Sequence, residues 1–77
     1  MNIPLADVTL HIDENLAAER RQAINGKIQA MTGIASVLNP EAKPHLAVVR
    51  YDPEMASADA ILAMVRNEGV HAELIGL

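Results

Sequence analysis

His45-Leu46-Ala47-Val48-Val49-Arg50-Tyr51 is the segment of the chain richest in residues that favour β-strands, and Asp52-Pro53 follows it directly. β-Branched and aromatic side chains fit the half-buried surface of a sheet, whereas Asp followed by Pro favours a turn. The segment therefore predicts a strand that ends at Tyr51. Its largely apolar composition predicts a central place in a sheet.

Three further segments predict strands on either side of this one. Val8–Asp13 alternates apolar and polar residues, which is typical of a strand with one buried face, and Val70–Ile75 alternates in the same way. Ile34–Leu38 is a short apolar run, and the two prolines of Asn39–Pro44 prevent its continuation. The sequence thus predicts four strands.

Two helices are expected between these strands. Apolar residues recur every three or four positions over Glu14–Thr32, with Asp13 as the expected N-cap and Gly33 as the expected C-terminal cap. Ser57 is a suitable N-cap for a second helix that ends before Gly69.

The order strand, helix, strand, strand, helix, strand is the split βαβ pattern of ferredoxin-like α+β sandwiches. It predicts an antiparallel four-stranded sheet with two helices on one face, in which the first and third strands are central and the last lies beside the first. With 77 residues the chain has room for one domain, residues 1–77, of which 1–5 are expected to form a loose tail.

Composition excludes several classes of function. The net charge of −4 disfavours nucleic acids and anionic membranes, and a single aromatic residue leaves no platform for stacking bases. No apolar run reaches the ~20 residues that span a bilayer, and the first residues do not form a secretory signal, so we expect a cytoplasmic chain without membrane insertion. Neither a catalytic triad nor a Gly-rich phosphate loop is visible, which predicts that the protein is not an enzyme.

Three spaced motifs resemble one family. Gly33-Ile34, Ala47–Pro53 and Gly69–Ala72 are similar to the Gly-Val, Ala-x-Val-x-Tyr-Asp-Pro and Gly-Tyr-x-Ala motifs of the heavy-metal-associated domains of copper chaperones and P-type metal-transporting ATPases. The resemblance covers the chain from about Val8 to Leu77 and implies the ferredoxin-like fold and a role in metal-ion handling or transport.

The chain departs from that family where the family binds metal. Members usually carry Gly-Met-Thr-Cys-x-x-Cys after the first strand, and the resemblance places the two cysteines at Ala17 and Arg20, in a chain with no cysteine at all. Neither alanine nor a protonated arginine can ligate a metal ion. The resemblance therefore implies a small non-enzymatic module that acts mainly by docking to a related metal-handling domain, a transporter or a second copy of itself.

The expected docking surface is the sheet face that the helices leave uncovered. By alternation this face presents more aliphatic side chains than a wetted surface requires, and such patches often mark partner surfaces. Isolated exposed aliphatics are also common without any partner. The residues that predict this surface are Leu38, Leu46, Val48, Arg50 and Ile75.

An alternative function is the binding of a divalent metal ion without cysteine. The topology brings all three histidines to one end of the sheet, and alternation directs His11 and His71 outward from neighbouring strands, close enough to share Zn²⁺, Ni²⁺ or Cu²⁺. His45 has inward parity and is a weaker candidate. Exposed strand histidines often have no ligand, so this reading stays open. The carboxylates that could complete the shell are Asp13, Glu14, Glu68 and Glu73.

Overall fold

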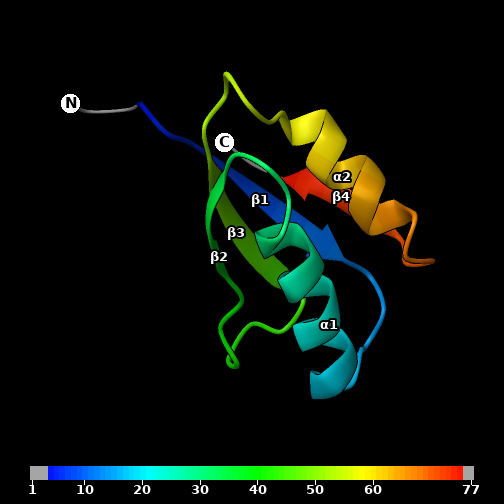
Figure 1. The fold of residues 1–77 in the computed structure, drawn as a ribbon. Coiled ribbons are helices and arrows are strands. Elements are labelled where there is room, and N and C mark those ends of the chain that lie inside the picture. Colours follow the sequence, from blue (N-terminus) through cyan, green and yellow to red (C-terminus); the bar gives the residue numbers. More distant parts are fainter. Residues whose placement is uncertain (1–3, 76–77) are drawn as a thin grey trace.

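The computed structural model describes residues 4–75, which form one four-stranded antiparallel sheet and two helices (Figure 1). The strand order is β2-β3-β1-β4, so the predicted ferredoxin-like βαββαβ topology is confirmed. The tail expected at residues 1–5 falls largely on residues 1–3, outside the described residues. The elements are β1 (Ala6–Ile12), α1 (Ala18–Gln29), β2 (Ile34–Leu38), β3 (Leu46–Tyr51), α2 (Ala58–Arg66) and β4 (Ala72–Ile75).

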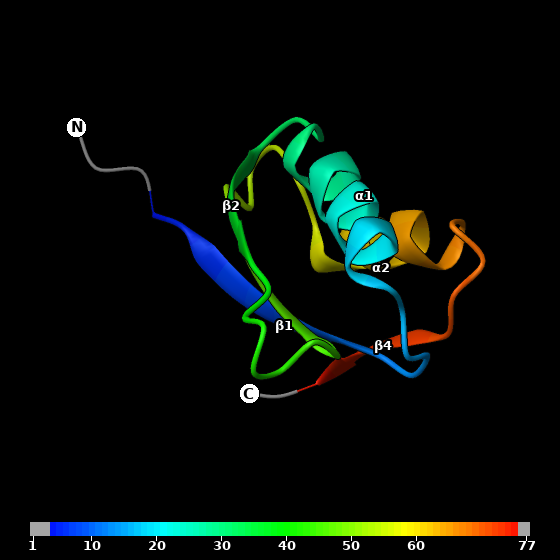
Figure 2. The same cartoon turned by 90° about the horizontal axis from the view of Figure 1, so that it is seen from below.

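Both helices pack on the same face of the sheet, as Figure 2 shows from below. The core between the two layers is built from the alternate strand residues that face the helices, such as Leu10 and Val49, and from Ile24, Ile61 and Val65 on the helices, all fully or almost fully buried. The opposite face of the sheet carries no helix. Neither helix in the described part of the chain is long and apolar enough to cross a membrane.

The first helix begins later than the sequence predicts. Asp13 does not cap it, because α1 starts at Ala18 and its N-cap is Ala17, which offers no side-chain hydrogen bond. The carboxylates of Asp13 and Glu14 contact histidine side chains instead, so the chain leaves β1 as a loop. The helix also ends at Gln29, before the expected Thr32.

The boundaries of β2 and the start of α2 follow local signals closely. β2 spans the predicted residues, and Ser57 caps α2 by accepting a hydrogen bond from the Ala60 amide at 3.0 Å. The last strand begins two residues late, at Ala72 rather than Val70, which changes the residues that face β1.

Gly33 holds the turn between α1 and β2 in a conformation that other residues rarely adopt. Its φ is +91°, and its carbonyl accepts a hydrogen bond from the Asp52 amide at 2.8 Å. A Cβ atom at this position would lie 2.8 Å from the Cβ of Met55. Gly26, in contrast, is an exposed residue inside α1, and a Cβ there would meet nothing within 4 Å.

Substitution of the two glycines by alanine should therefore change the stability of the protein in opposite directions. Gly26→Ala should raise the free energy of unfolding by about 0.5–1 kcal/mol, because alanine loses less backbone entropy in a helix. Gly33→Ala should lower it by about 1–3 kcal/mol through backbone strain and the contact with Met55. Urea denaturation of both variants and the wild type measures the difference, and equal stabilities would contradict this account of the turn.

Candidate metal centre

The three histidines gather at one end of the sheet, as the topology predicts. His11 lies on β1, whereas His45 and His71 precede β3 and β4. The backbone holds these segments together, because the Ile12 amide donates to the His45 carbonyl and the Asp13 amide donates to the His71 carbonyl, both at 2.9 Å.

His11 is the centre of a compact group of ligand-type side chains. Glu73 on β4 lies directly opposite His11 on β1, and its Oε1 is 2.7 Å from His11 Nδ1. Asp13 Oδ1 contacts the same nitrogen at 3.1 Å. His11, Asp13 and Glu73 each offer one ligand atom, and these atoms all lie within 4.8 Å of one another. We refer to these three residues as the His11 cluster.

The expectation that His71 faces His11 directly is wrong, because β4 begins at Ala72 and places Glu73 at that position. The ring of His71 is directed to Glu14, with 2.6 Å between Nδ1 and Oε2. The Glu14 carboxylate also accepts the His71 backbone amide at 2.9 and 3.0 Å. A share of His71 in metal binding stays a prediction.

The third histidine, His45, contacts the ring of His11. Its ring stacks on that of His11, with 5.7 Å between the ring centroids and 20° between the planes. His45 Nδ1 is 2.6 Å from the Ile12 carbonyl oxygen, which can only accept, so this nitrogen carries the proton. The stack and the hydrogen bond fix the orientation of the His45 ring.

The carboxylates shift the protonation of both exposed rings. The hydrogen bond that the His11 ring donates to Glu73 raises the pKa of His11, against a smaller opposing effect of desolvation. The hydrogen bond that the His71 ring donates to Glu14 raises the pKa of His71, and the same contact lowers the pKa of Glu14. A proton and a metal ion would therefore compete for Nδ1 of His11.

The donor atoms of the His11 cluster fit a particular class of ion. One imidazole nitrogen and two carboxylate oxygens suit borderline divalent ions such as Zn²⁺, Ni²⁺ or Cu²⁺, whereas Cu⁺ prefers sulfur ligands. Three protein ligands leave at least one coordination position open. All three side chains are partly exposed, so an ion can reach them from solvent.

The positions at which the resemblance places cysteines have other roles here. Ala17 is the N-cap of α1. Arg20, in the first turn, donates to the Glu68 carbonyl, and Lys27 Nζ lies 2.7 Å from Glu68 Oε1. The contact with Lys27 lowers the pKa of Glu68. Glu68, one of the carboxylates considered for a metal shell, thus joins α1 to the turn after α2.

The expected docking residues lie on the helix-free face of the sheet. Leu38 is 61% exposed and Ile75 is 40% exposed, whereas Leu46 and Val48 are half-buried. Arg50 pairs with Asp7 across the strands, with 3.0 Å between Nε and Oδ1. Docking through this face stays a prediction.

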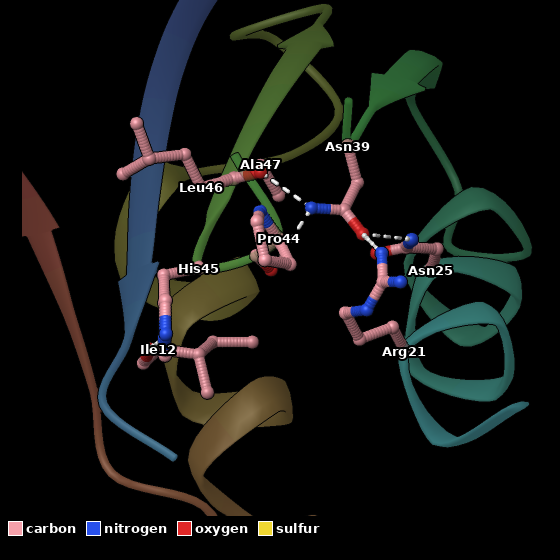
Figure 3. Close-up of a pocket in the computed structure, with 8 residues that line it drawn as sticks. All are labelled: Ile12, Arg21, Asn25, Asn39, Pro44, His45, Leu46 and Ala47. Atoms are coloured by element: carbon pink, nitrogen blue, oxygen red, sulfur yellow. Dashed lines mark hydrogen bonds between the residues drawn. The ribbon is translucent and has the colours of Figure 1, made fainter. Parts of the chain in front are cut away.

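A small cavity lies between α1 and the loop that joins β2 to β3 (Figure 3). Asn39 connects its walls, since its Oδ1 accepts from Arg21 at 3.1 Å and Asn25 at 3.2 Å, and its Nδ2 donates to the Leu46 carbonyl at 2.6 Å. About 10 Å³ is open inside, which is the space of one water molecule. This cavity is not predicted by the sequence, in which an Asn directly after a strand is the only signal for it.

The contact between Glu14 and His71 should be visible in the titration of the imidazole. The contact holds the pKa of His71 above its ordinary value of 6.5. The pair therefore stabilises the folded state fully at pH values below the pKa of His71 in the unfolded chain. This stabilisation is lost as the pH rises through the pKa of His71 in the folded protein. Glu14→Gln should lower the pKa of His71 and leave that of His11, which depends mainly on Glu73, unchanged. Histidine NMR signals followed against pH measure both values. A wild-type His71 that titrates at or below 6.5 would contradict the contact.

Comparisons with known proteins find matches to the fold of this chain but not to its sequence. No protein-family model matches the sequence, and no curated protein matches it. Solved structures do match: the copper-binding domain of HMA7, a P-type ATPase, has a TM-score of 0.81 at 14% identity and covers 91% of this chain and 93% of its own.

Two further structures agree with this match. The yeast copper transporter domain Ccc2a has a TM-score of 0.80 at 21% identity over 91% of this chain and 94% of its own. Oxidized MerP from Ralstonia metallidurans CH34 has a TM-score of 0.80 at 17% identity over 92% and 97%. The chain therefore has the fold of the heavy-metal-associated domains of copper chaperones and P-type ATPases.

Proposed function

We propose that this protein is a small metal-handling module that binds a divalent transition-metal ion through the His11 cluster. The observation that carries the proposal is the convergence of one imidazole and two carboxylates, with their ligand atoms within 4.8 Å of one another. The fold adds support, because proteins with this fold include copper-binding domains and a metallochaperone. The module binds an ion and performs no reaction on it.

The ligand set distinguishes this module from its cysteine-bearing counterparts. The chain contains no cysteine, and Arg20 and Ala17 supply no ligand atom. Nitrogen and oxygen ligands favour Zn²⁺, Ni²⁺ and Cu²⁺ over Cu⁺. We therefore expect a module with the same fold but a preference for harder ions.

Metal binding can be tested by adding Zn²⁺, Ni²⁺ or Cu²⁺ to the metal-free protein and following the NMR signals residue by residue. We expect saturable changes at the His11 cluster. His11→Gln and Glu73→Gln should each weaken binding by more than about tenfold, since even the loss of an outer-shell partner costs about 10–100-fold. Both side chains are partly exposed, so the variants should fold.

His71→Gln is the matched control. It removes an exposed imidazole from the same end of the sheet but leaves the His11 cluster intact. Binding that survives His71→Gln and is lost in His11→Gln supports the proposal. Binding that depends on His71 alone, or no saturable change with any ion, would overturn it.

A second candidate function is self-docking through the helix-free face of the sheet. Leu38 and Ile75 are exposed aliphatic side chains on this face, and the neighbouring Asp7 and Arg50 carry opposite charges. Two copies related by a two-fold axis can exchange such a pair of charges across an apolar centre, because a two-fold interface must be complementary to itself. A second copy of the chain is therefore the partner that this face fits.

Sedimentation equilibrium tests self-docking directly. The wild type should form a dimer at high concentration, and Leu38→Glu should remain a monomer because it places a charge in the apolar contact. Met55→Glu is a control, since Met55 is about as exposed as Leu38 but lies outside the sheet. A wild type that stays monomeric throughout would exclude this interface.

A further inference from the structure

His45 is bound to the end of β1 from two directions. The Ile12 amide donates to the His45 carbonyl at 2.9 Å, and His45 Nδ1 donates to the Ile12 carbonyl at 2.6 Å. The backbone and the ring of His45 are therefore both tied to the residue that follows His11 in the chain. These bonds hold the ring in place, although His45 lies in the loop before β3.

Asn39 fixes the chain on both sides of His45. Its Nδ2 donates to the Pro44 carbonyl at 3.2 Å and to the Leu46 carbonyl at 2.6 Å (Figure 3). Its Oδ1 accepts hydrogen bonds from two side chains of α1. The loop that carries His45 is therefore anchored to the helix layer, and the ring of His45 is a fixed surface against which another side chain can rest.

The side chain of His11 has more freedom. It is 37% exposed and turns about two single bonds, and the hydrogen bonds of its Nδ1 go to the carboxylates of Asp13 and Glu73. An ion bound between these three groups would take the place of the proton on Nδ1 and so remove both hydrogen bonds. The stack on His45, with 5.7 Å between ring centroids, is a contact of the His11 ring that the ion leaves intact.

We propose that His45 is a positioning residue of the metal site, whose stacked ring holds the imidazole of His11 in the orientation that directs Nδ1 toward Asp13 and Glu73. The inference rests on the proposed metal site and adds a residue outside the group of ligand atoms that lie within 4.8 Å of one another. A ring that is held beforehand loses less conformational entropy when the ion binds. Loss of the stack should therefore weaken ion binding although every ligand atom remains.

Zinc binding by two variants, His45→Phe and His45→Leu, tests the proposal. Both variants lose the hydrogen bond to Ile12, but phenylalanine keeps a flat ring for the stack, whereas leucine keeps only apolar bulk. We expect His45→Phe to bind zinc within about threefold of the wild type and His45→Leu to bind it about tenfold or more weakly, because the loss of an outer-shell partner costs about 10–100-fold. Urea denaturation of both variants shows whether they are equally stable.

A second measurement does not need the ion. Three-bond couplings of the His11 side chain in the zinc-free protein should indicate one χ1 rotamer in the wild type and in His45→Phe, but an average over several rotamers in His45→Leu. A role of His45 in stability alone would not produce this difference between the two variants.

Equal zinc affinity of His45→Phe and His45→Leu, whether unchanged or weakened, would overturn the inference, as would identical His11 couplings in the two variants. Equal weakening would mean that His45 acts through its nitrogens and not through the stack. A wild type that binds no zinc contradicts the proposed function together with this inference, whereas equally tight binding by all three proteins contradicts only the role of His45.

Discussion

The pairing of β1 with a strand on each side is the constraint on which the rest of the structure depends. Leu10 lies between Ala47 of β3 and Leu74 of β4, and it is completely buried beneath the helices. Because successive side chains of a strand alternate between faces, this burial turns His11 to the opposite face, between Leu46 and Glu73. The core and the candidate metal site are thus set by the same strand.

Much of the fold could be predicted because its signals are local. The prolines after Leu38 end β2, and the Ser57 hydroxyl caps α2 where the sequence places it. The start of α1 could not be predicted in this way. Asp13 resembles an N-cap, but its carboxylate contacts His11, a tertiary interaction that no capping rule describes.

The candidate site was predictable in its place but not in its members. His71 and Glu73 are two residues apart and have the same parity, so alternation alone cannot decide which of them faces His11. The choice depends on the register between β1 and β4, which packing of the whole sheet determines. The stack of His45 on His11 was likewise missed, because His45 precedes its strand and does not follow the strand's alternation.

The His11 cluster joins two distant parts of the chain. His11 and Glu73 are 62 positions apart, and only the complete sheet brings them together. In an unfolded chain these groups are dispersed, so an ion that needs all of them binds the native state alone and shifts the folding equilibrium toward it. Such an ion would also fasten the short strand β4 to β1, and would thereby act as a reversible cross-link between the beginning and the end of the domain.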